Sequence, residues 1–151
     1  MILPATIALA DDAATARLGQ AVAGALGGRE AVCLTGPLGA GKSTLARALV
    51  RALTTPDEDV PSPTFTLVQF YDAADFPLAH FDLYRLSSPD EAYEIGLDEA
   101  LDEGAAIIEW PQRLAGRLPA DRLDIDIAFN GDGRVARLSG HGAWEGRTLE
   151  F

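Results

Sequence analysis

The chain has 151 residues, of which 48% are hydrophobic and 23% charged, and its formal net charge is −11. This composition is typical of one folded domain spanning residues 1–151, and it excludes wholesale disorder. The acid excess excludes unaided binding to a nucleic-acid backbone or an anionic membrane, because both need clustered cations.

In chain order, the first expected elements are a short strand at 7–9 and a helix that Asp11 or Asp12 caps. That helix should end at the glycines 27–28. A strand at 31–35 and a helix at 42–53 enclose a glycine-rich loop. Beyond the loop at 54–63, strands at 64–71 and 78–86 are expected to form a hairpin around a turn at 72–77.

The second half of the chain alternates helices and strands. The predicted helices are 89–96, 97–103 and 111–118, and an apolar strand is predicted at 105–110. Alternating apolar and acidic residues at 123–129 indicate an exposed strand, which a turn at 130–133 joins to a return strand at 134–139. The last residues, 144–151, are expected to form one more edge strand. This succession predicts an α/β fold with a central mixed β-sheet flanked by helices.

Residues 36–43, GPLGAGKS, match the phosphate-loop pattern G-x-x-x-x-G-K-[ST] at every defined position. In such a loop the glycines let backbone N–H groups surround a diphosphate, and the following helix adds its positive end. Lys42 is expected to reach the β and γ phosphates, and Ser43 to offer its hydroxyl to Mg²⁺. Lys42 is the only lysine among 12 basic residues, and a compact ammonium fits between phosphates where a planar guanidinium does not. The motif predicts a P-loop NTPase-like domain.

Two carboxylates close predicted strands and are candidates for the metal site. Glu109 follows the apolar residues 105–108, and Asp82 follows 78–81. Either side chain can hold Mg²⁺ or its water, or can be a surface carboxylate at a strand end. His80 projects to the same face as Asp82, so it either orients Asp82 or a water, or simply packs. His141, between two glycines, is expected at the surface.

The acidic residues are concentrated in one segment. Residues 52–112 contain 14 acidic residues and one base, Arg85. This segment is either a solvated face or a docking surface for a basic partner. Cys33 lies in an apolar stretch and is expected to be a buried structural thiol. No apolar run approaches 18 residues and no signal peptide is recognisable, so we expect no membrane association and a cytoplasmic location.

Four segments together resemble the bacterial TsaE (YjeE) family of small ATPases, over residues 5–140. They are GPLGAGKST at 36–44, SPTFTLV at 62–68, HFDLYR at 80–85 and EWP at 109–111. The resemblance implies an ATPase needed to form N6-threonylcarbamoyladenosine beside the anticodon of tRNAs that read codons starting with A. It also implies that the protein acts on the TsaD–TsaB complex and resets it between turnovers. Contact with tRNA is then expected to be indirect, because the chain is acidic.

The resemblance also implies roles for individual residues. Asp82 matches an acidic residue needed for activity, and 62–65 resembles a mobile switch near the γ-phosphate. Ser43 and Glu109 would ligate Mg²⁺, and Ala10, Asp11 and Arg134 would lie near the adenine. The loop positions expected to bind the ATP phosphates are Leu38, Gly39, Ala40, Gly41, Lys42, Ser43 and Thr44.

We expect in-line attack of water on the γ-phosphate, with Lys42 stabilising charge and Asp82 positioning the water or its metal neighbour. Arg85 is expected either to reach phosphate or to neutralise nearby acids. The alternative function is a small-molecule P-loop kinase, although a lid rich in arginine is hard to find between Arg51 and Arg113. A second alternative is a nucleotide-gated scaffold without catalysis.

Overall fold

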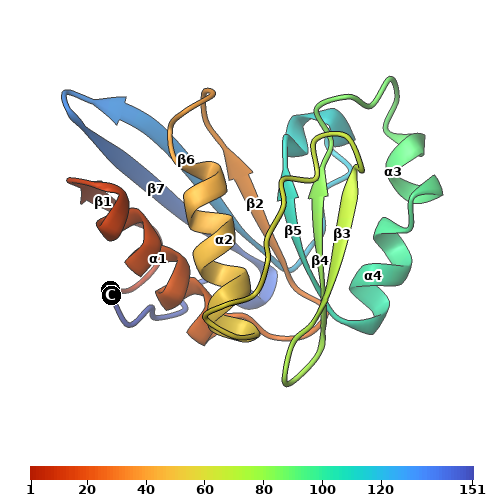
Figure 1. Ribbon diagram of the computed structural model, residues 1–151, viewed down its shortest axis with the longest axis horizontal. Helices are drawn as coiled ribbons and strands as arrows, with labels where there is room; N and C mark the ends of the chain where they lie inside the picture. The colour runs from red at the N-terminus through yellow and green to blue at the C-terminus, as the bar shows by residue number, and fades with distance from the viewer.

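One mixed β-sheet of seven strands organises the chain (Figure 1), and the computed structural model describes all residues, 1–151. The strand order across the sheet is β1-β7-β6-β2-β5-β4-β3. The strands are β1 (Ala5–Leu9), β2 (Ala31–Thr35), β3 (Val68–Asp72), β4 (Pro77–Asp82), β5 (Ala105–Glu109), β6 (Arg122–Asn130) and β7 (Gly133–His141). The helices are α1 (Asp12–Ala25), α2 (Lys42–Leu53), α3 (Asp90–Glu94) and α4 (Leu97–Glu103), with 3₁₀ turns η1 (Pro111–Leu114) and η2 (Gly142–Trp144).

The centre of the sheet is parallel and its two margins are antiparallel. Strand β2 pairs in parallel with both β5 and β6, and β4 pairs in parallel with β5. Strands β7 and β1 extend one side antiparallel, and β3 closes the other as a hairpin with β4. The predicted mixed sheet is therefore confirmed, and so is the predicted hairpin, which β3 and β4 form. Because β2, β4 and β5 run the same way, the residues that follow them meet at one edge of the sheet.

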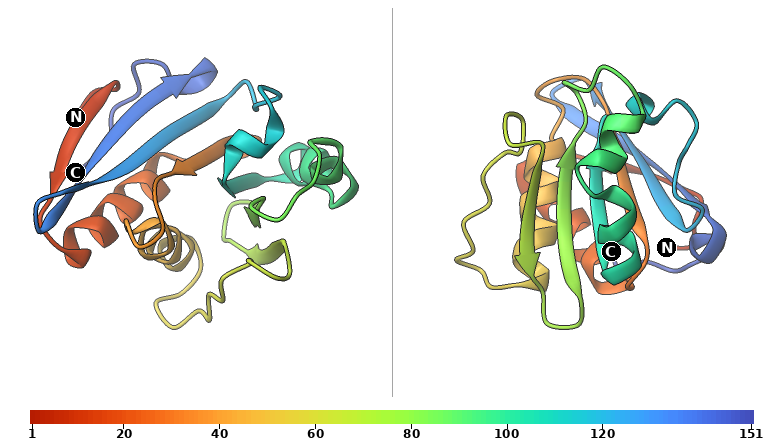
Figure 2. Two further views of the ribbon diagram at one scale, coloured as in Figure 1. Left: turned by 90° about the horizontal axis from the view of Figure 1, so that it is seen from above. Right: turned by 90° about the vertical axis from the view of Figure 1, so that its right-hand side faces the viewer.

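Helices cover both faces of the sheet (Figures 1 and 2). Along β2, Val32 and Leu34 pack in the core that α1 and α2 cover, while Ala31 and Cys33 pack in the core that α3, α4 and η1 cover. This alternation follows from the two-residue period of a strand. Burial raises the pKa of the Cys33 thiol to about 12, so this cysteine has the structural character expected of it.

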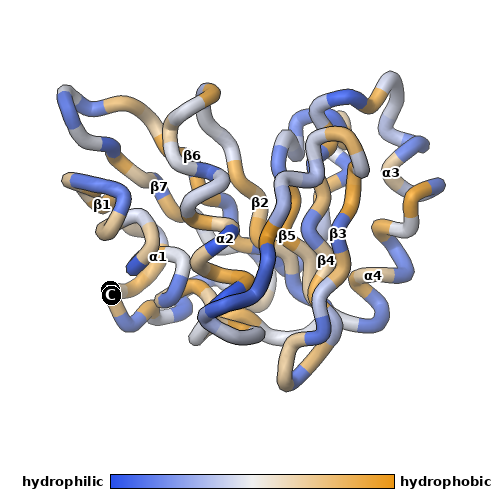
Figure 3. Tube along the Cα trace, viewed as in Figure 1, coloured by the Kyte–Doolittle hydropathy of each residue, from blue (hydrophilic) through white to orange (hydrophobic).

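The α1–α2 pair is closely packed on its face of the sheet. Asp11, one of the two predicted capping residues, caps α1, because its carboxylate accepts a hydrogen bond from the Ala14 N–H at 2.8 Å. Gly19 lies at the crossing, where a Cβ would stand 2.6 Å from the Leu45 carbonyl oxygen. Hydropathy along the chain is high in the central strands, whereas the loop after α2 is strongly hydrophilic (Figure 3).

Several predicted boundaries are wrong, each for a local reason. Strand β3 begins only at Val68, because residues 64–67 form a turn in which the Leu67 N–H donates to the Pro63 carbonyl at 2.7 Å. Strand β4 ends at Asp82 rather than residue 86, because the Asp82 side chain accepts the Tyr84 N–H and turns the chain. The predicted helix at 111–118 is a four-residue 3₁₀ turn.

The predictions for the last third of the sheet also need correction. Strand β6 is not an exposed strand: it lies between β2 and β7, and solvent reaches its acidic face and Phe129 near its end. Residues 144–151 do not form an edge strand, because they contribute one isolated bridge, Ile2 to Thr148. Strand β1 is the edge on that side. No helix combines the length and the apolar character needed to cross a bilayer.

Candidate functional site

The phosphate-loop motif connects β2 to α2, as the sequence predicts. Its glycines adopt backbone angles that other residues rarely reach: φ is 145° at Gly36 and 112° at Gly41. A Cβ at Gly36 would collide with the backbone oxygen of Ile127, and Gly41 is the left-handed residue that begins α2. Glycine is therefore required at both positions for the loop to curl beneath the start of the helix.

Helix α2 begins without a side-chain cap, in contrast to α1. Asp11 satisfies the Ala14 N–H in the first turn of α1, whereas Gly41 makes no capping hydrogen bond. The first N–H groups of an α-helix have no partner within the helix, and the helix dipole adds positive potential there. The start of α2 is thus prepared to bind an anion in the manner of phosphate loops.

Lys42 occupies the mouth of this loop and is largely buried, with 7% of its surface exposed. Its Nζ donates a 2.7 Å hydrogen bond to the Gly36 carbonyl and lies 4.3 Å from the centre of the Trp110 ring. Trp110 has a left-handed backbone, with φ of 59°, directly before Pro111. Such conformations cost free energy and cluster at functional sites.

The carboxylates of Asp82 and Glu109 lie side by side at the ends of β4 and β5. The two residues are paired in the parallel register, and both are about 95% buried. Side chains two or four residues apart on a strand lie on the same face of the sheet. Asp82 therefore shares a face with Leu78 and Glu109 with Ile107, and both of these apolar residues pack in the core that α2 covers. Both carboxylates therefore point toward the phosphate loop.

Asp82 holds the segment that the sequence suggested as a switch. Its Oδ2 accepts a 3.2 Å hydrogen bond from the Thr64 hydroxyl, and its Oδ1 accepts the Tyr84 N–H at 3.0 Å. The Ser62 and Thr64 hydroxyls are 2.8 Å apart. The 62–65 segment is consequently tied to the same carboxylate that faces the loop.

Glu109 has a different partner, and this corrects one expectation. The expectation that His80 orients Asp82 is wrong, because its Nε2 lies 2.7 Å from Glu109 Oε2 in a buried contact. The imidazole points across the sheet to β5 instead of along its own strand. His141, expected at the surface, is 42% exposed and its Nε2 lies 3.0 Å from Asp124.

A cavity of about 420 Å³ joins these groups. Nine residues predicted from the sequence line it, together with four that the site prediction did not include. The predicted nine are Leu38, Gly39, Gly41, Lys42, Ser43, Thr44, Asp82, Glu109 and Arg134, and the other four are Asp12, Ser62, Thr64 and Trp110. Three of the additional residues lie in the quoted motifs 62–68 and 109–111, so the sequence carried a signal for them.

Three predicted residues do not line the cavity. Ala40 is the fully buried residue of the loop, and Ala10 and Asp11 are not part of the cavity lining. Their neighbour Asp12 lines the cavity instead, because the Asp11 carboxylate is used as the helix cap. Arg134 is opposite Leu9 in the β1–β7 register, and its guanidinium donates a 3.3 Å hydrogen bond to the Gly39 carbonyl. The N-terminal segment, Arg134 and the phosphate loop are therefore neighbours.

The oxygen donors suit a hard cation such as Mg²⁺. The Ser43 hydroxyl and the carboxylates of Asp82 and Glu109 all line the cavity. No three or more His, Cys, Asp or Glu side chains form a cluster that could hold a metal ion. The fit is thus to a cation that takes part of its coordination from phosphate oxygens and water, as Mg²⁺ does at nucleotide sites.

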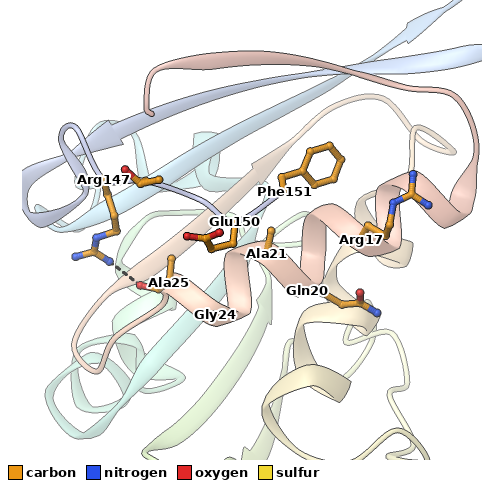
Figure 4. A pocket seen from close by; sticks show the side chains of 9 residues that line it. Arg17, Gln20, Ala21, Gly24, Ala25, Arg147, Glu150 and Phe151 are labelled. Carbon is orange, nitrogen blue, oxygen red and sulfur yellow. Dashed lines mark hydrogen bonds between the residues drawn. The ribbon is translucent and has the colours of Figure 1, made fainter. Parts of the chain in front are cut away.

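Two other features lie apart from this cavity. The Arg85 guanidinium lies 4.4 Å from the centre of the exposed Phe65 ring, forms no ion pair with an acidic side chain and does not line the cavity. A larger cavity of about 620 Å³ lies between α1 and the C-terminal segment (Figure 4). None of the phosphate-loop residues or the buried carboxylates lines it, and its Arg147 is bonded to Ala25 and Glu30.

The loop, the uncapped helix and the carboxylates at the strand ends define an α/β protein with a P-loop NTPase-like fold. A crystal structure of Bacillus subtilis YdiB superposes with a TM-score of 0.75 and 26% identity, covering 95% of this chain and 89% of that one. The sequence profile of the family described as threonylcarbamoyl adenosine biosynthesis protein TsaE matches residues 9–137. The chain belongs to the TsaE family, which confirms the resemblance seen in its sequence.

Individual relatives are similar along most of the chain, and all three described here are tRNA threonylcarbamoyladenosine biosynthesis proteins TsaE. The Rickettsia conorii protein is 36% identical over 113 residues, which are 75% of this chain and 65% of that protein. The Rickettsia bellii protein is 36% identical over 118 residues, covering 78% of this chain and 82% of that protein. The Aquifex aeolicus protein is 43% identical over 100 residues, covering 66% and 71%.

Proposed function

We propose that this protein is a Mg²⁺-dependent ATPase that serves the formation of N6-threonylcarbamoyladenosine in tRNA. The observation that carries the proposal is the 420 Å³ cavity, in which Lys42, Ser43 and two buried carboxylates converge on an uncapped helix start. The second support is the chain's membership of a family described by this biosynthesis. A cavity of this kind suits a polyphosphate and a hard cation better than an apolar ligand.

Each residue has a distinct task in this proposal. The N–H groups at the start of α2 bind phosphate oxygens, and Lys42 exchanges its contact with the Gly36 carbonyl for the β and γ phosphates. When bound, Mg²⁺ neutralises the charge that develops on the phosphates, and Ser43 and Glu109 are the residues that would hold it. Asp82 orients the attacking water, and its hydrogen bond to Thr64 fixes the switch segment beside that water.

We further propose that the partners are TsaD and TsaB, and that tRNA is met only through them. The net charge of −11 opposes direct binding to a polyanion, and the acidic segment 52–112 offers a surface for a basic partner. The proposed site of this activity is the cytoplasm. At physiological salt the isolated protein should form no tight complex with tRNA, and tight binding would contradict this arrangement.

Phosphate release from ATP, measured with wild type and with Asp82→Asn, tests the proposed reaction. We expect the substitution to lower the hydrolysis rate at least about a hundredfold while ADP affinity stays within a few fold, since Asp82 acts on water and not on the nucleotide. His141→Gln, at a partly exposed histidine 3.0 Å from an aspartate, is the control and should leave the rate unchanged. A hydrolysis rate that survives Asp82→Asn would exclude this role.

A further inference from the structure

We propose that His80 is a positioning residue that sets the Glu109 carboxylate for metal binding, a role that rests on the proposed Mg²⁺-dependent function. The imidazole Nε2 lies 2.7 Å from Glu109 Oε2, and the two side chains are only 3% and 7% exposed. A carboxylate accepts hydrogen bonds, so the Nε2–H donates to it. This contact fixes one oxygen of Glu109 and leaves the other carboxylate oxygen free to act as a ligand.

The geometry of the sheet makes this contact possible. His80 is paired with Ile107 across the parallel β4–β5 ladder, and Glu109 is two residues further along the same face. The imidazole therefore reaches diagonally across to the carboxylate. Asp82, which follows His80 by two residues on β4, takes its hydrogen bonds from Thr64 and Tyr84 instead. The two carboxylates are thus held by separate sets of donors.

The other ring nitrogen of His80 indicates that the histidine is not explained by packing. His80 Nδ1 is buried and has no hydrogen-bond partner. A buried polar atom without a partner costs free energy, and an apolar side chain at this position would avoid that cost. Leu78, two residues earlier on the same face, shows that the core there accepts an aliphatic residue. What the imidazole provides, and a leucine would not, is the hydrogen bond to Glu109.

Orientation by a hydrogen-bonded neighbour is known to raise metal affinity about ten- to a hundredfold. If His80 has this role, its loss should weaken the metal-dependent part of nucleotide binding and leave the metal-independent part alone. A merely structural histidine would instead affect both parts together or neither. The distinction can be measured without any catalytic activity.

The test is calorimetric titration of the full-length protein with ADP, once with saturating MgCl₂ and once with EDTA. The ratio of the two affinities measures the metal contribution. We expect His80→Leu to lower this ratio about ten- to a hundredfold with unchanged affinity in EDTA. His80→Gln keeps an N–H near the Nε2 position and should hold the ratio within about threefold of wild type. His141→Leu, which breaks the partly exposed pair with Asp124, should change neither affinity.

Each outcome decides the proposal. An unchanged ratio in a folded His80→Leu protein would overturn it, as would a His80→Gln ratio that falls as far as that of His80→Leu. If His80→Leu does not fold, His80→Asn replaces it, because its shorter amide cannot reach Glu109 Oε2. If Mg²⁺ does not strengthen ADP binding to the wild-type protein, the metal part of the proposed function would be overturned, and the role of His80 with it. If Mg²⁺ strengthens ADP binding to the wild type, and strengthens it equally in His80→Leu and His80→Gln, only the role of His80 would be overturned.

Discussion

The ammonium of Lys42 lies 4.3 Å from the centre of the Trp110 ring, so the only lysine of the chain is held between the phosphate loop and the residue after Glu109. The left-handed backbone of Trp110 turns its ring over this ammonium. A cation over an indole face is stabilised by the ring quadrupole, most strongly where water is excluded. The contact links the loop after β2 to the end of β5.

Replacement of Lys42 by arginine should fail to preserve nucleotide binding. The ammonium fits a buried position against the Gly36 carbonyl, and a planar guanidinium is too wide for it. We expect Lys42→Arg and Lys42→Ala each to weaken ADP binding at least about tenfold, or about 1.4 kcal/mol. Calorimetry measures this, with Arg47→Ala, at an exposed position on the same helix, as the control. Wild-type affinity in Lys42→Arg would contradict the account of the lone lysine.

Amine-directed labelling should report nucleotide binding at a single site. The chain has only two amines, Lys42 and the N-terminus. The N-terminal ammonium donates to the Leu149 carbonyl, far from the loop, whereas Lys42 is 7% exposed. MgATP should therefore slow the modification of Lys42 further and leave that of Met1 unaltered, as peptide mass spectrometry can quantify. Equal protection of both amines would indicate a general change in structure instead.

Two glycines of α1 should respond in opposite directions to the same substitution. A Cβ at Gly19 would stand 2.6 Å from the Leu45 carbonyl, whereas nothing lies within 4 Å of a Cβ at Gly24. Gly19→Ala should destabilise the fold by about 1–3 kcal/mol through overpacking of α1 on α2. Gly24→Ala should stabilise it by about 0.5–1 kcal/mol, because alanine loses less backbone entropy in a helix. Denaturant unfolding measures both, and a shared sign would contradict the packing of α1 on α2.

The Glu30–Arg147 pair should make stability depend on pH in the acid range. Burial alone would raise the pKa of Glu30, but hydrogen bonds from Arg147 and the Gly27 N–H lower it below its usual value of 4.5. A lowered folded-state pKa stabilises the protein above the unfolded pKa, and this contribution is lost as the pH falls through the folded value. Glu30→Gln should therefore lower the melting temperature more at pH 7 than at pH 3.

The expected loss at pH 7 is about 1–3 kcal/mol, since two hydrogen bonds of 2.7 and 2.8 Å join the charged groups. Asp90→Asn is a suitable control, because it breaks an ion pair with Arg117 in which both side chains are more than half exposed. That variant should melt close to wild type at both pH values. A constant difference between Glu30→Gln and wild type across this range would argue against the pair as the cause.

Patterns of short range predicted the phosphate loop and most elements correctly. The Asp11 cap and the glycines 36 and 41 are local features, so the sequence carried them directly. Features that depend on contacts between distant segments were predicted less well. Strand β6 looked exposed because one face is acidic, yet pairing with β2 and β7 makes it central. The partner of His80 depends on the β4–β5 register, which no local pattern specifies.

The measurement that bears most directly on the proposed function is the ATP hydrolysis rate with and without purified TsaD–TsaB. The chain supplies no arginine to its own cavity other than Arg134, which is bonded to the Gly39 and Gly133 carbonyls, so hydrolysis alone should be slow. We predict that TsaD–TsaB raises the hydrolysis rate of the wild type at least about tenfold, and that Lys42→Ala abolishes this increase. A wild-type rate that the pair leaves unchanged, or a Lys42→Ala protein that responds as wild type does, would contradict the account.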